Sequence, residues 1–331
     1  MAARRLAVAG GLLVLGVTGH AGATTLGIDG ERFTLGGKPA FLLGVSYYGG
    51  LGAPPDAVRA DLDDLARMGI NWIRLWVTWG AGEADVSAVD SEGALRQPYA
   101  TRLVDLVREA DERGIVVDVT YTRGEGLSTL PAHERAVRAV AELLRDWRNV
   151  YIDLANERNV GDARYVSFDG LAVLRQAVRE ADPERLVTAS QGGDIAEDEL
   201  RGYVETAGVD FIAPHRPRHA GSPAETEAKT RWYREQLAAM GKPMPVHYQE
   251  PFRRDYGDWQ PGAADFIADL DAAVAGGAAG WCLHNGSPRG GAAGPARSFD
   301  LRPPNRRLLE QLDDEELGAL KDMAACVVGN G

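Results

Sequence analysis

Two stretches of this sequence decide its expected fold: Asn149-Val-Tyr-Ile-Asp-Leu-Ala-Asn156-Glu157 and Met244-Pro-Val-His-Tyr-Gln-Glu250. Each has the short apolar run of a buried strand, and each ends in a glutamate. A carboxylate at the end of an apolar strand costs free energy unless it has a partner or a task. Both stretches belong to a longer alternation of strand-like and helix-like segments.

That alternation predicts eight strands joined by helices. Strands are expected at 41–46, 71–77, 114–121, 150–155, 186–190, 209–213, 245–249 and 279–283. Helices are expected at 55–68, 132–147, 165–181, 225–240, 263–275 and 305–311, with one more around Leu103, Leu106 and Val107. Such alternation implies parallel strands with helical crossovers, and eight units in one run favour a closed barrel. No glycine-rich dinucleotide loop follows the first strand, which counts against an open sheet.

We therefore expect an α/β fold with a single (β/α)₈ TIM barrel over residues 24–331. Barrels of this kind take about 250 residues, so the 331-residue chain is long enough for one. Two strand-like pieces between Leu26 and Ala40 meet at Asp29-Gly30, which is typical of a β-hairpin. We expect this hairpin to cover the N-terminal end of the barrel. The glycine-rich stretch 286–295 is expected to be a loop after the last strand.

Residues 1–23 are expected to be a signal peptide. Arg4-Arg5 precedes an apolar run from Leu6 to Gly19, and Ala21-Gly22-Ala23 resembles a cleavage site. A membrane anchor is the alternative, but the run is shorter than the roughly 20 residues that a spanning helix needs. The pattern predicts a secreted or periplasmic protein with no membrane association after cleavage.

The chain is acidic, with a formal net charge of −12. Without the two arginines of the expected signal peptide, 34 basic residues face 48 acidic ones, a net charge of −14. This balance disfavours nucleic acids and anionic membranes as partners, and we expect a monomer. Cys282 and Cys326 either form a disulfide, which an exported protein allows, or Cys282 stays a buried free thiol.

Both glutamates are expected at the carboxyl ends of barrel strands, where such barrels hold their active sites. Because side chains alternate along a strand, Glu157 should share the lumenal face with Tyr151 and Asp153, and Glu250 is in phase with Val246 and Tyr248. Two such carboxyl groups, about 5–5.5 Å apart, are what a retaining glycosidase needs.

The structural alternatives are ion pairs. Glu157 could cap a helix or pair in a loop, and Glu250 could pair with Arg253 or Arg254.

Further residues near the strand ends are expected to contact a substrate. Arg74 lies on the lumenal face of its strand and needs an anionic partner, which is either Glu250 or a structural Asp118 or Asp153. The remaining expected binding residues are a hydrogen-bonding Asn156, a stacking Trp281, Tyr48, and His215. The alternative for His215 is a loop histidine bonded to backbone.

Other chemistries lack their sequence patterns. The chain has no Gly-x-Ser-x-Gly elbow, no His-Glu-x-x-His pair and no phosphate-binding loop. His215 and His219 are four residues apart, but Pro217 between them prevents a shared helix face for zinc.

With these residues, the chain resembles the retaining glycosidases that carry glutamates on strands 4 and 7, and within them glycoside hydrolase family 5, the cellulase-like family. The likeness covers nearly the whole mature chain. It lies in Phe33-Thr-Leu-Gly-Gly-Lys-Pro-Ala-Phe-Leu-Leu-Gly-Val45, Asp64-Leu-Ala-Arg-Met-Gly-Ile-Asn-Trp-Ile-Arg74, Asn156-Glu157, Gly241-Lys-Pro followed by Glu250, and Gly280-Trp281. The resemblance implies a carbohydrate substrate, Glu157 as acid/base, Glu250 as nucleophile with Arg74 as its partner, Trp281 under the sugar, and no metal or organic cofactor.

The chain departs from the family pattern in two places. After strand 6 the family has His-x-Tyr, whose tyrosine bonds the nucleophile, whereas this chain has His215-Arg-Pro. After strand 3 the family often has a histidine, whereas this chain has Tyr121-Thr-Arg. Tyr121, Tyr47 and Tyr248 are the candidates to replace the missing tyrosine.

The sequence thus predicts an exported β-glycosidase that works by double displacement. Glu250 would attack the anomeric carbon. Glu157, kept protonated by its apolar strand and by the charge of Glu250, would protonate the leaving oxygen. The alternatives are a barrel that binds carbohydrate without cleaving it, and a transglycosylase.

Overall fold

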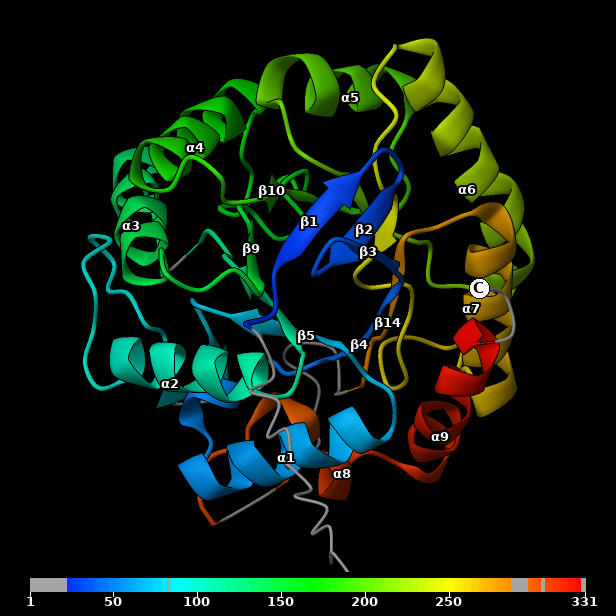
Figure 1. The fold of residues 1–331 in the computed structure, drawn as a ribbon, viewed down its shortest axis with the longest axis horizontal. Helices are drawn as coiled ribbons and strands as arrows, with labels where there is room; N and C mark the ends of the chain where they lie inside the picture. The colour runs from blue at the N-terminus through cyan, green and yellow to red at the C-terminus, as the bar shows by residue number, and fades with distance from the viewer. Residues whose placement is uncertain (1–22, 82–83, 125, 287–296, 305–306, 329–331) are drawn as a thin grey trace, which may run out of the picture.

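A barrel of parallel strands ringed by helices forms the body of the computed structural model (Figure 1), which describes residues 23–81, 84–124, 126–286, 297–304 and 307–328. The expected signal peptide, 1–23, lies outside the described residues apart from Ala23, and so does most of the expected loop 286–295. In the part of the chain that the structure describes, no helix has the length and apolar character to cross a membrane.

Eight strands close the barrel in chain order. They are β4 (Leu42–Ser46), β5 (Trp72–Trp76), β8 (Val116–Thr120), β9 (Val150–Asp153), β10 (Val187–Thr188) continued by β11 (Ser190–Gly192), β12 (Ala213–His215), β13 (His247–Tyr248) and β14 (Gly280–Leu283). Seven of them form one parallel ladder in the order β10-β9-β8-β5-β4-β14-β13. β12 closes the ring, because it pairs with β11 and the adjacent Ile212 forms a parallel bridge to Val246. The expected (β/α)₈ barrel is confirmed.

Helices surround the barrel as the apolar periodicity predicts. They are α1 (Pro55–Arg67), α2 (Tyr99–Asp111), α3 (Leu130–Leu143), α4 (Phe168–Ala181), α5 (Glu197–Arg201), α6 (Ser222–Ala239), α7 (Ala263–Gly276), α8 (Leu308–Gln311) and α9 (Asp314–Val328). In α1 the buried residues include Val58, Leu62 and Leu65, at helical spacing. The sequence did not predict α5, which has only five residues and runs into the π-helical turn Gly202–Ala207, or α9 at the C-terminus.

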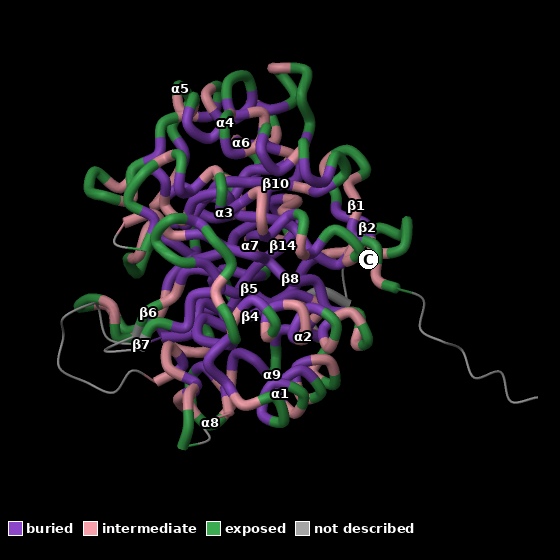
Figure 2. The backbone as a smooth tube through the Cα atoms, turned by 90° about the vertical axis from the view of Figure 1, so that its left-hand side faces the viewer, coloured by how far each residue is buried: buried purple, intermediate pink, exposed green. Residues whose placement is uncertain are grey.

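A small antiparallel sheet closes the N-terminal end of the barrel, as expected. Its strands are β1 (Leu26–Asp29), β2 (Arg32–Leu35) and β3 (Lys38–Ala40), with Gly30 at φ 58° in the first turn. Phe33 points into the lumen, fully buried, and packs edge-to-face on Phe211 at 5.0 Å between ring centroids. Burying such a ring contributes about 1.5–3 kcal/mol. In Figure 2 this sheet lies on one side of the barrel and the hairpin of β6 (Gly80–Ala81) and β7 (Ala84–Asp85) on the opposite side, where the strands end.

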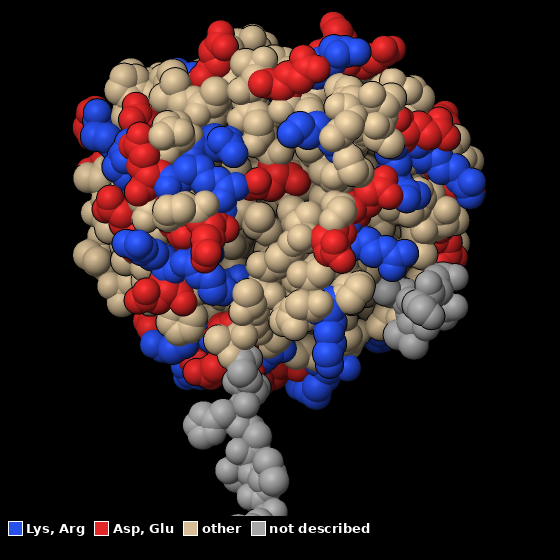
Figure 3. Space-filling view, turned by 45° about the horizontal axis from the view of Figure 1, so that its top comes forward, with Lys and Arg blue, Asp and Glu red and all other residues tan. Residues whose placement is uncertain are grey.

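Cys282 and Cys326 do not form a disulfide, so of the two alternatives left open by the sequence the buried thiol holds for Cys282. Cys282 lies in β14 with its Sγ 3.7 Å from Ser46 Oγ. Cys326 lies on α9, in contact with the backbone oxygen of Asp322. On the surface, acidic and basic side chains are interspersed over the face seen in Figure 3.

Candidate active site

Glu157 and Glu250 converge at the carboxyl ends of β9 and β13. An oxygen of each carboxylate and Nδ1 of His215 all lie within 4.8 Å of one another. His215 Nδ1 is 3.3 Å from Glu157 and 3.5 Å from Glu250. Glu157 has φ 46°, in the left-handed region that side chains other than glycine rarely adopt, and its N–H donates to Ser190 Oγ at 3.1 Å. Such backbone strain is typical of functional sites.

Arg74 forms the floor of this site. Its guanidinium is fully buried and donates to Glu250, to Asp153 at 2.8 Å, to Asp118 at 3.2 Å and to Asn156 Oδ1 at 2.8 Å. The functional and the structural partners expected for Arg74 are therefore both present. A buried charge of this kind is stable only when opposite charges and hydrogen bonds satisfy it, as they do here.

Arg218 is the main feature that sequence reasoning missed. Its Nη2 donates to Glu157 Oε1 at 3.2 Å and to Glu250 Oε2 at 3.0 Å, so one nitrogen bridges the two carboxylates. The guanidinium also lies over the ring of Tyr256, 4.3 Å from its centroid. A basic residue three positions after His215, in the segment without the family's tyrosine, was the available signal.

Positive groups keep Glu157 ionised in the free protein. Burial raises the pKa of Glu157, but the hydrogen bond and charge of His215, together with the charges of Arg218 and Arg164, outweigh burial and lower the pKa to about 2. The predicted protonated Glu157 is therefore wrong for the free protein. Opposite charges at contact distance favour the charged form more than the apolar strand disfavours it.

Glu250 is ionised for a similar reason. Burial opposes its charge, but neighbouring positive charge lowers the pKa of Glu250 to about 2. Burial also lowers the pKa of His284 well below its usual value, so this histidine is neutral near pH 7, and the two arginines that donate to Glu250, Arg74 and Arg218, stabilise its charge. His284 follows β14, with Nε2 3.5 Å from Glu250, and was not predicted.

Trp281 does not lie in the site, so its predicted stacking role is wrong. The indole is fully buried and its Nε1 donates to Asp269 Oδ2 of α7 at 2.7 Å. Because side chains alternate along β14, Cys282 faces the lumen and Trp281 faces the helices. Tyr48 lies beside the site but is only 2% exposed, and its ring stacks on Trp76 at 4.4 Å rather than presenting an open face.

The three tyrosines proposed to contact the nucleophile all bond elsewhere. Tyr47 donates to Asp61 Oδ2, Tyr121 donates to the backbone oxygen of Ala136, and the Tyr248 hydroxyl lies 2.6 Å from Thr230 Oγ1.

The prediction that Glu250 shares the lumenal face of its strand with Tyr248 is also wrong. Tyr248 faces α6 while Gln249 faces the lumen, where it donates to Asp118. Glu250 nevertheless reaches the site because it lies beyond the end of β13, where strict alternation stops.

The Glu157, His215 and Glu250 cluster has the donor types of a metal site. The two carboxylates already accept hydrogen bonds from Arg74 and Arg218, and these fixed positive charges oppose a further cation. The cluster is better suited to act on a substrate than to hold an ion.

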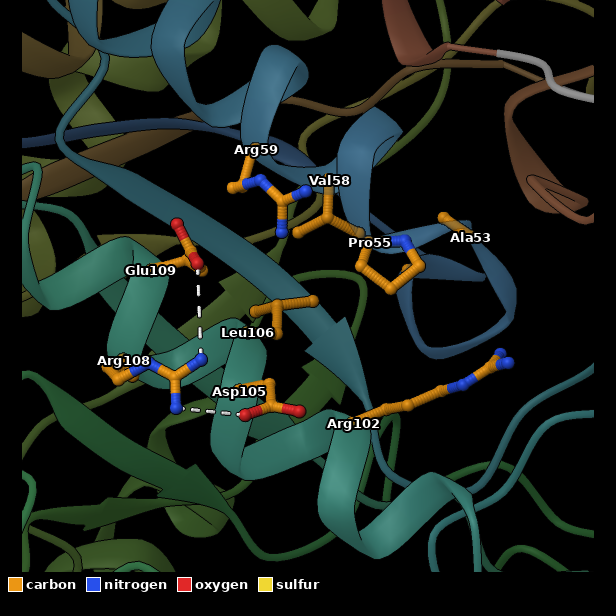
Figure 4. Close-up of a pocket in the computed structure, with 10 residues that line it drawn as sticks. Ala53, Pro55, Val58, Arg59, Arg102, Asp105, Leu106, Arg108 and Glu109 are labelled. Carbon is orange, nitrogen blue, oxygen red and sulfur yellow. Dashed lines mark ion pairs between the residues drawn. The ribbon is translucent and has the colours of Figure 1, made fainter.

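A surface pocket lies elsewhere, between α1 and α2 (Figure 4). Arg59, Arg102, Asp105, Arg108 and Glu109 contribute its charged groups, and Asp105 pairs with Arg108 at 3.0 Å. This pocket is on the outer ring of helices, away from the strand ends that carry the glutamates.

No protein-family model and no curated protein matches this sequence. Among solved structures, the chain is similar to a glycoside hydrolase family 5 structure from Bacteroides vulgatus ATCC 8482, with 18% identity, a TM-score of 0.64, and coverage of 91% of this chain and 70% of that one. It is also similar to an endo-1,4-beta-mannanase from Rhizomucor miehei, with 13% identity, a TM-score of 0.62, and coverage of 92% and 99%. The chain is similar as well to a beta-1,4-D-mannanase from Cryptopygus antarcticus, with 14% identity, a TM-score of 0.60, and coverage of 91% of this chain and 95% of that one.

The chain has the fold of these glycoside hydrolases. The expected likeness to family 5 is confirmed at the level of the fold.

Proposed function

We propose that this protein is an exported, monomeric glycoside hydrolase that cleaves a β-glycosidic bond with retention of configuration. The observation that carries the proposal is the pair of carboxylates at the ends of β9 and β13, with oxygens within 4.8 Å of each other. Retaining enzymes place their carboxyl groups about 5–5.5 Å apart, whereas inverting enzymes need about 6.5–9.5 Å to admit a water.

In this mechanism Glu250 is the nucleophile. Its oxygen forms a bond to the anomeric carbon as the glycosidic C–O bond breaks and the leaving oxygen takes a proton from Glu157. Glu157 then removes a proton from water, which attacks the same carbon and releases Glu250. Arg74 supports this assignment because it keeps Glu250 ionised without blocking its second oxygen.

Glu157 needs a proton for the first step, and the free site holds it ionised. Substrate must therefore displace Arg218 from Glu157 before cleavage, since this guanidinium donates to both glutamates and lies between them. Moving this guanidinium away weakens the stabilisation of the carboxylate and lets Glu157 take up a proton.

The test is sugar release from β-linked polysaccharides and aryl β-glycosides, with mannan included because two of the similar structures are mannanases. The full chain is compared with Glu250→Gln and with Glu205→Gln, a control at an exposed residue that pairs with Arg201. We expect release by the unaltered chain and by the control only. A fluorinated glycoside should also label Glu250 covalently, as read by peptide mass spectrometry. Equal rates in Glu250→Gln, with no label, would overturn the mechanism.

A barrel that binds carbohydrate without cleaving it is the second candidate. Arg218 favours this candidate because it occupies the space between the carboxylates. Sugar binding by calorimetry, without release or labelling, would support the binding protein.

A further inference from the structure

Arg218 lies where the scissile bond must lie. Its Nη2 is within 3.2 Å of one oxygen of Glu157 and 3.0 Å of one oxygen of Glu250. In a retaining mechanism the glycosidic oxygen contacts the first of these groups and the anomeric carbon contacts the second. A sugar can enter only if the guanidinium moves. The side chain is 17% exposed, so it has some access to solvent for that movement.

A displaced guanidinium needs a new anionic partner. The aspartates near the site are not available as this partner, because each already pairs with another arginine. Asp118 and Asp153 pair with Arg74, and Asp162 pairs with Arg164 at 2.8 Å.

Arg253 lies beside Arg218 and adds to the positive charge. Both guanidiniums pack on the ring of Tyr256, at 4.3 Å for Arg218 and 4.8 Å for Arg253. Within the described part of the chain, no carboxylate lies within ion-pair distance of Arg253, and its buried Nε has no hydrogen-bond partner. Two arginines on one ring at the mouth of a site form a geometry suited to a carboxylate or a sulfate.

The loss of one negative charge during the reaction also favours an anionic substrate. In the free protein, Glu157 pairs with Arg218 and Arg164, and Glu250 pairs with Arg218 and Arg74. When Glu157 becomes protonated for catalysis, one of these two negative charges disappears. An anionic group on the substrate would restore the balance.

Unpartnered polar atoms also mark a ligand site here. Nδ1 of His284, whose ring contacts Glu250, is buried and lacks a hydrogen-bond partner among the described residues. His215 Nε2 is buried in the same way. Buried polar groups without partners are costly, and sugar hydroxyls are suitable partners for them.

We propose that the substrate carries an anionic group on the sugar bound between the glutamates, and that Arg218, assisted by Arg253, is the residue that selects it. The inference rests on the proposed glycosidase function and names its substrate class. The anionic group is a uronic acid carboxylate or a sulfate ester, since both match a guanidinium.

Direct binding tests this inference without requiring turnover. Methyl β-D-glucuronide, methyl β-D-glucoside and the 6-sulfate of that glucoside are titrated into the full chain by calorimetry. We expect one of the two anionic ligands to bind at least tenfold more tightly than the neutral one, and the tighter one identifies the anion. Arg218→Gln should abolish this difference, Arg218→Lys should restore part of it, and the exposed Arg201→Gln should leave it unchanged.

Tighter or equal binding of the neutral glucoside by the unaltered chain would overturn the inference. So would an unchanged preference in Arg218→Gln, provided that its thermal unfolding matches that of the unaltered chain. Failure of the proposed function is distinct, because it appears as absent sugar release and absent labelling of Glu250 whatever the binding preference.

Discussion

Replacement of Arg218 by glutamine should raise the pKa of Glu157 by about one to two pH units. Arg218 Nη2 lies 3.2 Å from Glu157 and 3.0 Å from Glu250, so its charge is shared between two carboxylates. Two unit charges about 4 Å apart interact by about 4 kcal/mol at an effective dielectric constant of about 20. Half of that energy is about 2 kcal/mol, and one pH unit corresponds to about 1.4 kcal/mol.

The sign follows from the charge that is lost. Arg218 favours ionised Glu157, so its removal lets the carboxyl keep its proton to higher pH. His215 and Arg164 remain and continue to lower this pKa, while burial and Glu250 oppose them. The rise should therefore stop near the ordinary value for a glutamate.

Carbon-13 NMR of labelled glutamate carboxyls measures this change directly, with the Glu157 signal assigned by its loss in Glu157→Gln. The matched control is Arg201→Gln, which removes an exposed arginine that pairs with Glu205 on α5 and its π-helical turn. A Glu157 titration that is the same in Arg218→Gln as in the unaltered chain would refute the electrostatic reasoning. A titration shifted to lower pH would refute it as well.

Three further results are expected. Arg74→Leu should lower the free energy of unfolding by about 3–5 kcal/mol in urea titrations, because it leaves buried carboxylates unpaired; a loss below about 1 kcal/mol would contradict the buried network. Trp281→Phe should cost about 1–3 kcal/mol through its lost hydrogen bond to α7 while leaving KM unchanged, whereas a raised KM would return this residue to the sugar site. Thiol titration of the unfolded, unreduced chain should find both Cys282 and Cys326 reactive, and an absence of reaction would reveal a disulfide.

The fold follows largely from local signals in the sequence. Most barrel strands are short apolar runs, and most of the larger helices, α6 excepted, show apolar residues at helical spacing, so these elements could be predicted without knowledge of their neighbours. The exceptions have physical reasons. Helix α5 is too short for a periodic pattern, and α9 follows the eighth strand, outside the strand–helix alternation that located the other helices.

The positions of the two glutamates and of Arg74 were also predictable. Parallel strands in a barrel bring all their carboxyl ends to one face, so residues far apart in sequence must meet there. Glu157 and Glu250 are 93 positions apart and still share His215 and Arg218. Knowing the topology was sufficient for this part of the site.

The sequence by itself therefore determined the barrel, its hairpin lid and the two carboxylates at its mouth. Tertiary structure alone decided which side chains surround those carboxylates. Trp281 turned outward and Glu250 inward because alternation holds within a strand but not beyond its end. Arg218 reached both glutamates from a loop, through contacts 61 and 32 residues apart in sequence. The protonation of Glu157 depends on the sum of such through-space charges, which a linear pattern of residues does not contain.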